Sequence, residues 1–225
     1  MTAGPTREPF DPARFISNPS TGRMGYALAT AARDRGAQVT LVSGPTALEA
    51  PEGIDLVRVQ TADEMLRATL NQFQGADLVL KAAAVSDYRP EVRSRAKLKK
   101  DVFARRGRTG GKGDRAIAAR LLPTTDILAE IGRRKKPHQI LVGFAAESGD
   151  LLRNARLKLR RKNLDLIVAN RIGAAGEGFE ADTNRALVLD RRGRRTDLPL
   201  MSKEAMASAI LDLAQPLLPR GQRSS

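Results

Sequence analysis

The chain has 225 residues, a formal net charge of +14, one histidine and no cysteine. Disulfides and thiol nucleophiles are therefore excluded, and a zinc site is not expected. No apolar run approaches the roughly 18 residues that a membrane span needs, and the polar N-terminus does not read as a signal peptide. We therefore expect a cytoplasmic protein that does not enter a membrane. The cation excess favours an anionic ligand, either nucleic acid or a small phosphorylated molecule.

Strands and helices alternate along most of the chain. Apolar residues at helical spacing predict the helices, and short apolar runs predict the strands. In chain order we expect a helix over 21–35 that ends at Gly36, strands over 37–44 and 53–61, a helix over 62–73 that begins with a capping box of Thr61 and Glu64, a strand over 76–85, a helix over 126–134 capped by Thr125, a strand over 139–148, a helix over 150–163 and a strand over 164–170. This order predicts an α/β fold, a Rossmann-like parallel sheet with helices on both faces.

Two segments interrupt the alternation. Residues 95–122 are predicted to form two strands joined by a Gly- and Arg-rich loop, which makes a β-hairpin extension of about 93–122. Residues 185–200 predict a second hairpin with its turn at 191–194, followed by an amphipathic helix over 201–214 and a frayed tail of about 219–225. No linker is apparent, so we expect a single domain over 1–225.

A loop of small polar residues, "ISNPSTGRMG", precedes the first predicted helix. Ser20, Thr21 and Gly22 would bring hydroxyl groups and backbone N–H groups to the positive end of that helix, where a phosphate could bind. The loop matches neither standard nucleotide fingerprint. Considered by itself, it is better interpreted as an ordinary Ser/Thr helix cap. Ligands of parallel sheets bind at the carboxyl ends of the strands, where Ser43, Asp87, Phe144 and Asn170 fall.

Seven stretches of sequence, taken together, favour the phosphate-binding interpretation of this loop over the plain helix cap. "TAGPTREPFDPARFISNPSTGRMG", "AAAVSDYRP", "KLKK", "TTDIL", "GFAAES", "KLRRKNLDLIVAN" and "GFEADTN" occur in this order. Together they closely resemble the phosphopantothenate–cysteine ligase domain of coenzyme A biosynthesis, from Thr2 to about Leu211. In bacteria this domain is usually the C-terminal half of a bifunctional flavoprotein, so the resemblance implies a flavin-dependent decarboxylase domain in the parent protein.

The resemblance also implies a reaction. CTP and 4'-phosphopantothenate form an acyl-cytidylate and release pyrophosphate, and L-cysteine then attacks the acyl carbon to give 4'-phosphopantothenoylcysteine and CMP. Mg2+ is the implied cofactor, held with CTP. A homodimer is implied, joined through the hairpin that carries "KLKK". No specific nucleic acid is implied.

Site residues follow from the resemblance by position. Asn18 would contact the acyl-cytidylate and Lys97 would neutralise charge on the phosphates, so these two are the predicted catalytic residues. Arg14 and Asn18 would bind the acid substrate, and no metal-binding residue is assigned. The implied nucleotide-binding residues are Ser20, Thr21, Gly22, Ala82, Ala83, Asp87, Lys97, Asp126, Ile127, Leu128, Phe144, Lys158 and Lys162.

Most of these residues also have plainer interpretations. Lys97 could be a charged residue of an edge strand, Asp87 a turn residue, and Phe144 a core residue. Lys158 and Lys162 share a helix face and could be solvated charges.

Two departures from the family are visible. Met1 stands where relatives have a hydrophobic strand, so the first, central strand is expected to be a stub. The loop over 104–114 is unusually rich in Gly and Arg.

Two other functions remain open from the residues. A short-chain oxidoreductase would need a glycine fingerprint and a Tyr-x-x-x-Lys pair, but Tyr26 is followed by Thr30 and Tyr88 by Val92. A nucleic-acid-binding module could use the basic hairpin. With 4% aromatic residues and no Trp, however, the chain has few side chains on which bases could stack.

Overall fold

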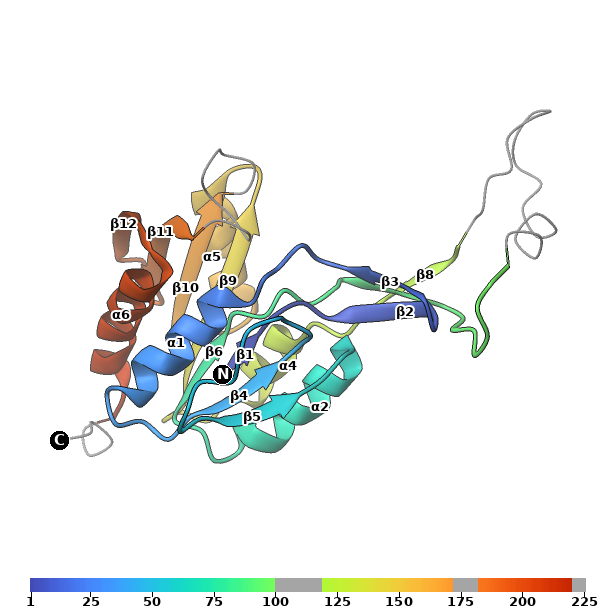
Figure 1. Cartoon of the computed structure of the whole chain (residues 1–225). Helices are drawn as coiled ribbons and strands as arrows, with labels where there is room; N and C mark the ends of the chain where they lie inside the picture. Colours follow the sequence, from blue (N-terminus) through green and yellow to red (C-terminus); the bar gives the residue numbers. More distant parts are fainter. Residues whose placement is uncertain (100–118, 172–181, 220–225) are drawn as a thin grey trace.

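The computed structural model of the chain describes residues 1–99, 119–171 and 182–219. Its centre is an eight-stranded sheet in the order β12-β11-β10-β9-β6-β1-β4-β5 (Figure 1). The six strands from β10 to β5 are parallel, and β11 and β12 pair antiparallel at one edge. The strands are β1 Thr2–Ala3, β4 Thr40–Ser43, β5 Asp55–Arg58, β6 Leu78–Lys81, β9 Ile140–Glu147, β10 Leu166–Arg171, β11 Thr183–Asp190 and β12 Arg195–Ser202. The predicted α/β fold with a Rossmann-like parallel sheet is confirmed, and the 185–200 hairpin extends that sheet.

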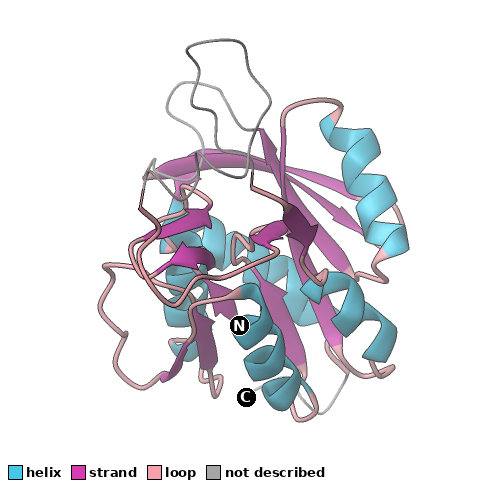
Figure 2. Ribbon diagram, turned by 90° about the vertical axis from the view of Figure 1, so that its right-hand side faces the viewer, coloured by secondary structure: helices cyan, strands magenta, loops and turns pink. Residues whose placement is uncertain are grey.

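Helices cover both faces of the sheet (Figure 2). One core lies under α1 and α6, where Leu28 and Ile210 pack, and the other lies under α2, α4 and α5, where Met65, Ile131 and Leu159 pack. The helices are α1 Arg23–Arg33, α2 Ala62–Phe73, α4 Ile127–Arg134, α5 Leu151–Arg161 and α6 Lys203–Ala214, with a short 3-10 helix, η1 Gln215–Leu217, after α6. Because side chains alternate along a strand, each central strand contributes to both cores.

The first strand has only two residues, as the sequence predicts, yet it lies in the middle of the sheet. Thr2 pairs with Val42 of β4 and with Lys81 of β6. The chain then continues along the segment that follows β6, where Gly4 O accepts from Ala84 N at 2.9 Å and Thr6 Oγ1 accepts from Ser86 N at 3.0 Å. These bonds hold the segment after β6 against the segment after β1.

Two small antiparallel sheets form an arm that projects from the main sheet (Figure 1). One pairs β2 Arg7–Asp11 with β3 Arg14–Ser17, and the other pairs β7 Tyr88–Pro90 with β8 Leu121–Pro123. The β2–β3 hairpin was not predicted. The expected strand from residue 95 is wrong, since residues 91–99 contain no strand. Arg95, Lys97 and Lys99 alternate as in a strand, but all three are exposed, so the alternation buries no face. Residues 100–118 of the predicted hairpin and 220–225 of the predicted tail lie outside the described residues.

Two helix starts differ from the prediction. Helix α1 begins at Arg23, after Gly22, which adopts a left-handed conformation at φ +82°, and no side chain caps this helix. The Ser/Thr cap interpretation is therefore wrong. Helix α4 is capped by Asp126, which accepts from Ala129 N at 3.0 Å, and not by Thr125. The capping box of Thr61 and Glu64 on α2 is confirmed.

We predict that Gly25→Ala destabilises the protein. Alanine normally favours a helix over glycine by up to about 1 kcal/mol. A Cβ on Gly25, however, would lie 2.5 Å from Ala3 Cβ and 2.9 Å from Ala3 Cα and Thr2 O, so α1 would have to move off β1. Overpacking of this kind costs about 1–3 kcal/mol. Urea unfolding measures the change. Gly75→Ala, where nothing lies within 4 Å of the added Cβ, is the matched control. An unchanged or raised unfolding free energy for Gly25→Ala would contradict the tight contact.

Candidate active site

A cleft of about 400 Å³ opens over the carboxyl ends of β6, β9 and β10, beside the first turn of α1. It brings together residues from five of the seven sequence motifs. The predicted site residues that line it are Asn18, Ser20, Thr21, Gly22, Ala82, Ala83, Asp87 and Phe144. Residues that the sequence did not single out also line it, among them Arg23, Lys81, Asn184 and Lys203.

The loop before α1 forms one wall of this cleft. Ser20 Oγ accepts from Gly22 N at 3.3 Å, so the hydroxyl folds back on its own loop. Position 22 requires glycine for two reasons: its φ is left-handed, and a Cβ there would lie 2.7 Å from Thr46 Cγ2. With no side-chain cap on α1, the backbone N–H groups of its first turn can serve an anionic ligand.

Asn18 connects this wall to the segment after β6. Its Nδ2 donates to Ala84 O at 3.0 Å, and the neighbouring Ser17 Oγ donates to Thr6 O at 2.7 Å. The bond to Ala84 fixes the orientation of the amide. An aspartate could not donate this bond, since an ionised carboxylate only accepts.

Lys81 lies at the floor of the cleft. Val79 packs into the α2, α4 and α5 core, so strand alternation turns Lys81 to the same face. Its Nζ donates to Ala83 O at 2.8 Å. Burial lowers the pKa of Lys81 from 10.5 to about 8, with a smaller contribution from the charge of Lys162. A lysine at the end of an apolar strand run was the signal that could have identified it.

Three other predicted residues lie beside Lys81 but do not line the cleft. Lys162 Nζ forms an ion pair with Asp126 Oδ2 at 2.7 Å, and Lys158 Nζ forms one with Glu147 Oε1 at 2.5 Å. Burial opposes ionisation of Asp126, but hydrogen bonds from Lys162 and Ala129 N outweigh it and hold the pKa of Asp126 below its usual range. The cations are thus neutralised by acids of this chain.

Ile127 and Leu128, also predicted to bind nucleotide, lie in the core under α4. Their exposed fractions are 2% and 5%. Any contact with a ligand would use their backbone.

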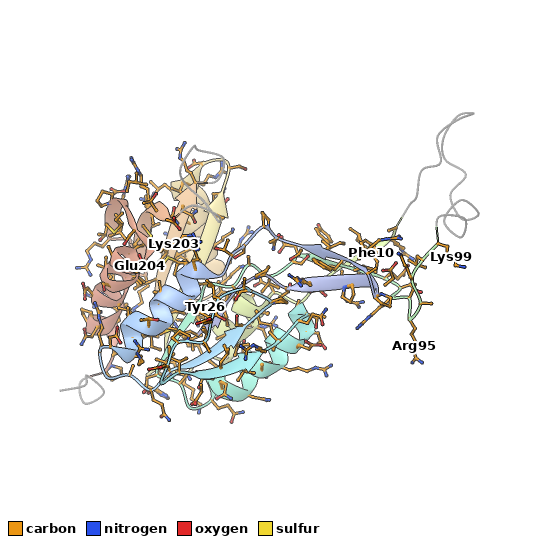
Figure 3. All side chains as sticks on the ribbon, in the orientation of Figure 1. Phe10, Tyr26, Arg95, Lys99, Lys203 and Glu204 are labelled. Carbon is orange, nitrogen blue, oxygen red and sulfur yellow. The ribbon has the colours of Figure 1, made fainter. Side chains whose placement is uncertain are left out.

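Arg14 and Lys97 lie on the arm and do not line the cleft. Arg14 Nη2 donates to Leu98 O at 3.0 Å, and Leu98 N donates to Asp11 Oδ2 at 3.0 Å, so this segment is fixed to the β2–β3 hairpin. Figure 3 shows Phe10, Arg95 and Lys99 together at the far end of the arm. Within one chain, Lys97 is therefore separated from the other predicted catalytic residue, Asn18.

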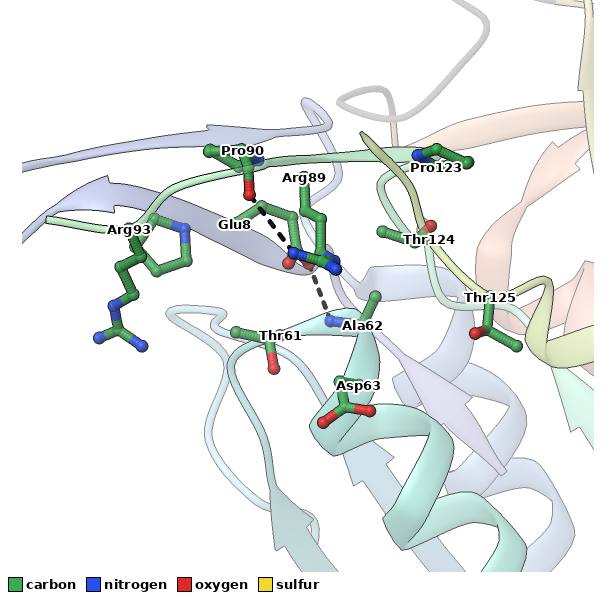
Figure 4. Close-up of a pocket in the computed structure, with 11 residues that line it drawn as sticks. Glu8, Thr61, Ala62, Asp63, Arg89, Pro90, Arg93, Pro123, Thr124 and Thr125 are labelled. Carbon is green, nitrogen blue, oxygen red and sulfur yellow. Dashed lines mark hydrogen bonds between the residues drawn. The ribbon is translucent and has the colours of Figure 1, made fainter. Parts of the chain in front are cut away.

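A second pocket, of about 470 Å³, lies between the arm and α2 (Figure 4). It contains none of the predicted site residues. Glu8, 3% exposed, accepts from Ala62 N at 2.8 Å at the start of α2. The carboxylate thereby anchors the arm to the main body of the protein.

Residues 1–217 match the family model described as "DNA/pantothenate metabolism flavoprotein C-terminal domain". The chain belongs to this family. The "Coenzyme A biosynthesis bifunctional protein CoaBC" of Bacillus subtilis (strain 168) is 46% identical, over 100% of this chain and 52% of that protein. The protein of the same name from Vibrio cholerae is 40% identical, over 95% of this chain and 51% of that protein. The chain spans about half the length of the curated relatives it matches.

Solved structures share this fold. The C-terminal domain of a Coenzyme A biosynthesis bifunctional protein CoaBC superposes with a TM-score of 0.76 at 40% identity, covering 94% of this chain and 90% of that chain. A Cab2 mutant in complex with phosphopantothenate-cysteine shares the fold, with a TM-score of 0.72 at 17% identity, covering 96% of this chain and 85% of that chain.

The described part of the chain offers few groups that could bind a metal ion directly. Among the described residues there is no group of three or more His, Cys, Asp or Glu side chains that could hold a metal ion. Asp87 is the one carboxylate among the described residues that line the cleft. A divalent cation would fit here only with most of its ligands supplied by a phosphorylated substrate.

In the described part of the chain, no helix is long and apolar enough to cross a membrane.

We predict that Lys81→Met stabilises the protein in a pH-dependent way. The pKa of Lys81 is about 8 in the folded protein, and its ordinary value, which applies to the unfolded chain, is 10.5. Between pH 8 and 10.5 the unfolded chain therefore binds more protons than the folded protein. The destabilisation of the parent by its buried ammonium is at its maximum below pH 8, and it disappears above pH 10.5. The variant should gain on the order of a few kcal/mol at pH 7, and the gain should shrink toward pH 10.5.

Urea unfolding of parent and variant at pH 7 and pH 10 measures this difference. Lys136→Met, which removes an exposed lysine, is the matched control and should show no such change. A stability difference that is the same at both pH values would show that Lys81 does not titrate as described.

Proposed function

We propose that this domain joins 4'-phosphopantothenate to L-cysteine with CTP as the energy source, by way of an acyl-cytidylate. The observation that carries the proposal is the cleft, in which residues of separate motifs meet at the carboxyl edge of the sheet. Membership in the family, whose relatives are named for coenzyme A biosynthesis, supports it. Both favour a ligase over the oxidoreductase and the nucleic-acid-binding module. The remaining half of the relatives' length leaves room for the flavin-dependent decarboxylase domain of the parent protein.

The proposed reaction has two displacement steps. A carboxylate oxygen of the acid attacks the α-phosphorus of CTP, and the bond to pyrophosphate breaks. The amine of cysteine then attacks the acyl carbon, loses a proton, and CMP leaves. Neither step needs a protein nucleophile, so a chain without Cys can carry out both by aligning the substrates and neutralising their charge. Mg2+ bound with CTP would neutralise part of the phosphate charge.

Each wall of the cleft has a role in this scheme. The first turn of α1 and the Ser20–Gly22 loop would receive phosphate, and Phe144, which lines the cleft, would contact the base. Asn18, oriented by Ala84 O, presents a neutral amide to the acyl-cytidylate. A carboxylate at that position would lose the bond to Ala84 and would repel an acyl phosphate.

The arm suggests how Lys97 takes part. Lys97 and Arg14 lie outside the cleft of their own chain, on an arm that projects from the sheet. We propose a homodimer in which the arm of one chain reaches the cleft of the second copy. Each cleft would then contain Asn18 of its own chain, together with the positive charges of Lys97 and Arg14 from the other chain.

We predict that the protein releases pyrophosphate from CTP only when 4'-phosphopantothenate and Mg2+ are present, and that CMP appears with L-cysteine. CTP should be used at least about tenfold better than ATP, because discrimination needs contacts to the base and Phe144 lines the cleft. A coupled pyrophosphate assay with each nucleotide measures both. Equal turnover with ATP would contradict the choice of CTP, and no turnover with either would contradict the ligase.

We predict that Asn18→Asp and Lys97→Gln are each nearly inactive alone and complement each other when mixed. A mixed dimer has one cleft with an intact Asn18 that faces an intact Lys97 of the other chain. With random exchange of subunits, the mixture should recover up to about a quarter of the parent activity. The measurement is product formation after the variants are mixed and allowed to exchange. If the mixture stays as inactive as its components, Lys97 does not act in the partner's cleft.

A further inference from the structure

The segment that carries Lys97 is held by the turn of the β2–β3 hairpin. Residues 91–99 contain no strand. Next to Lys97, Leu98 N donates to Asp11 Oδ2 at 3.0 Å, and Leu98 O accepts from Arg14 Nη2 at 3.0 Å. Both polar groups of the Leu98 backbone are therefore bonded to side chains at the hairpin turn, and these bonds keep the segment on the arm.

Asp11 uses its two carboxylate oxygens for different partners. It is the last residue of β2, and it is 2% exposed. Its Oδ1 accepts from Ala13 N at 2.8 Å and from Arg14 N at 2.9 Å, which closes the hairpin turn. Its Oδ2 accepts from Leu98 N, 87 residues further along the chain. The first oxygen thus builds the hairpin, and the second fixes another segment to it.

These contacts favour the ionised form of the carboxylate. The bond from Leu98 N is the largest of the causes that hold the pKa of Asp11 below its usual range. Burial acts in the opposite direction, but the bonds from Ala13 N and Arg14 N and the charge of Arg14 add to the lowering. Arg14 Nη1 lies 3.8 Å from Asp11 Oδ2. An ionised carboxylate only accepts hydrogen bonds, so both of its oxygens are available to N–H groups.

The hairpin turn by itself does not require an aspartate at position 11. Asparagine also closes turns of this kind, because its carbonyl oxygen can accept from the backbone N–H groups that follow it. It would, however, direct its NH2 group at Leu98 N–H, and two donors cannot bond each other. The second carboxylate oxygen therefore serves the bond to Leu98 and not the turn.

The bond to Leu98 acts on Lys97 through the peptide group that the two residues share. Leu98 N lies in the same planar unit as the carbonyl group of Lys97, so a fixed N–H restricts the direction of the Lys97 backbone. Lys97 is exposed, and a lysine side chain is long and flexible. The place that its ammonium can reach is therefore set mainly by its backbone.

We propose that Asp11 is a positioning residue for Lys97, because its Oδ2 holds the peptide group between Lys97 and Leu98 on the arm that presents the lysine to the nucleotide phosphates. This inference rests on the proposed function, in which Lys97 neutralises phosphate charge. Asp11 does not line the cleft of its own chain and acts only through Lys97. A displacement of about 1 Å in a group that aligns or neutralises substrates can cost on the order of 100-fold in rate.

The test is Asp11→Asn, which can keep the turn but replaces the acceptor for Leu98 N by a donor. We expect a melting temperature close to that of the parent. The rate of pyrophosphate release from CTP should fall by about 10- to 100-fold, while the KM for CTP changes by less than about threefold. The amide proton of Leu98 should exchange at least about tenfold faster than in the parent. Rapid-quench kinetics, thermal unfolding and exchange followed by NMR measure these quantities.

A double variant separates positioning from a general structural role. In the Lys97→Gln background there is no ammonium to position, so the addition of Asp11→Asn should slow pyrophosphate release by less than about twofold. A residue that only supports the fold would slow the Lys97→Gln protein by the same factor as the parent.

Asp190→Asn is the matched control. Asp190 Oδ1 accepts from Arg192 N at 3.0 Å and from Arg194 N at 2.8 Å, in the turn between β11 and β12 and away from the arm (Figure 1). This variant changes a turn aspartate in the same way and should release pyrophosphate at the parental rate. If Asp11→Asn does not fold, Asp11→Ser replaces it, because a serine hydroxyl can close the turn and leaves no second oxygen for Leu98.

The outcomes distinguish this inference from the proposed function. Parental pyrophosphate release by Asp11→Asn overturns the inference, and so does equal slowing in the presence and in the absence of Lys97. Unchanged exchange of the Leu98 amide proton also overturns it, since the bond would then not hold this peptide group. A parent protein that releases no pyrophosphate from CTP contradicts the proposed function, and that result needs no variant of Asp11. A parental rate for Lys97→Gln contradicts the role of Lys97 and, with it, the inference.

Discussion

The structure depends on the anchoring of the chain's first residues in the middle of the sheet. Thr2 Oγ1 accepts from Ala83 N at 3.2 Å, Thr6 N donates to Ala84 O at 3.3 Å, and Thr6 Oγ1 accepts from Ser86 N at 3.0 Å. Both threonines are buried. A two-residue strand is thus continued by side-chain and backbone bonds that hold the segments after β1 and β6 together. Because Asn18 also donates to Ala84, the same contacts fix both walls of the cleft.

The charge of the cleft follows from how the helices cover the sheet. Lys81 reaches the carboxyl edge from the face of α4 and α5, and Lys203 reaches it from the face of α1 and α6. Burial disfavours the charged form of each. Beside Lys81, Asp126 forms an ion pair with Lys162. The arrangement lowers the stability of the free protein and favours ligands with several negative charges, which the proposed nucleotide and phosphorylated acid both have.

The sequence predicted correctly those parts of the fold that depend on contacts between residues close together in the chain. The capping box of Thr61 and Glu64 lies within one helical turn, so the sequence places the start of α2 correctly. The start of α1 depends on a contact that is distant in sequence, because Thr46 leaves no room for a side chain on Gly22. The β2–β3 hairpin buries Glu8 against the N-terminus of α2. The residue pattern of the hairpin alone does not predict this contact, because the partner lies more than 50 residues away in sequence.

The candidate site was predicted only in part for the same reason. Motif resemblance identified Asn18 and Phe144, which line the cleft. It also implied Lys97, whose neighbour Leu98 is fixed to the arm by bonds with Arg14 and Asp11. It did not identify Lys81 or Lys203, because a lysine is unusual only when it is buried, and burial is decided by helices far along the chain. In a chain with 39 Lys and Arg residues, composition cannot distinguish these two from solvated cations. What distinguishes a buried lysine is the cost of desolvating its charge, and this cost arises only when the sheet and its helices enclose the side chain. A polyanionic substrate that binds beside the lysine can offset this cost by its favourable charge interaction.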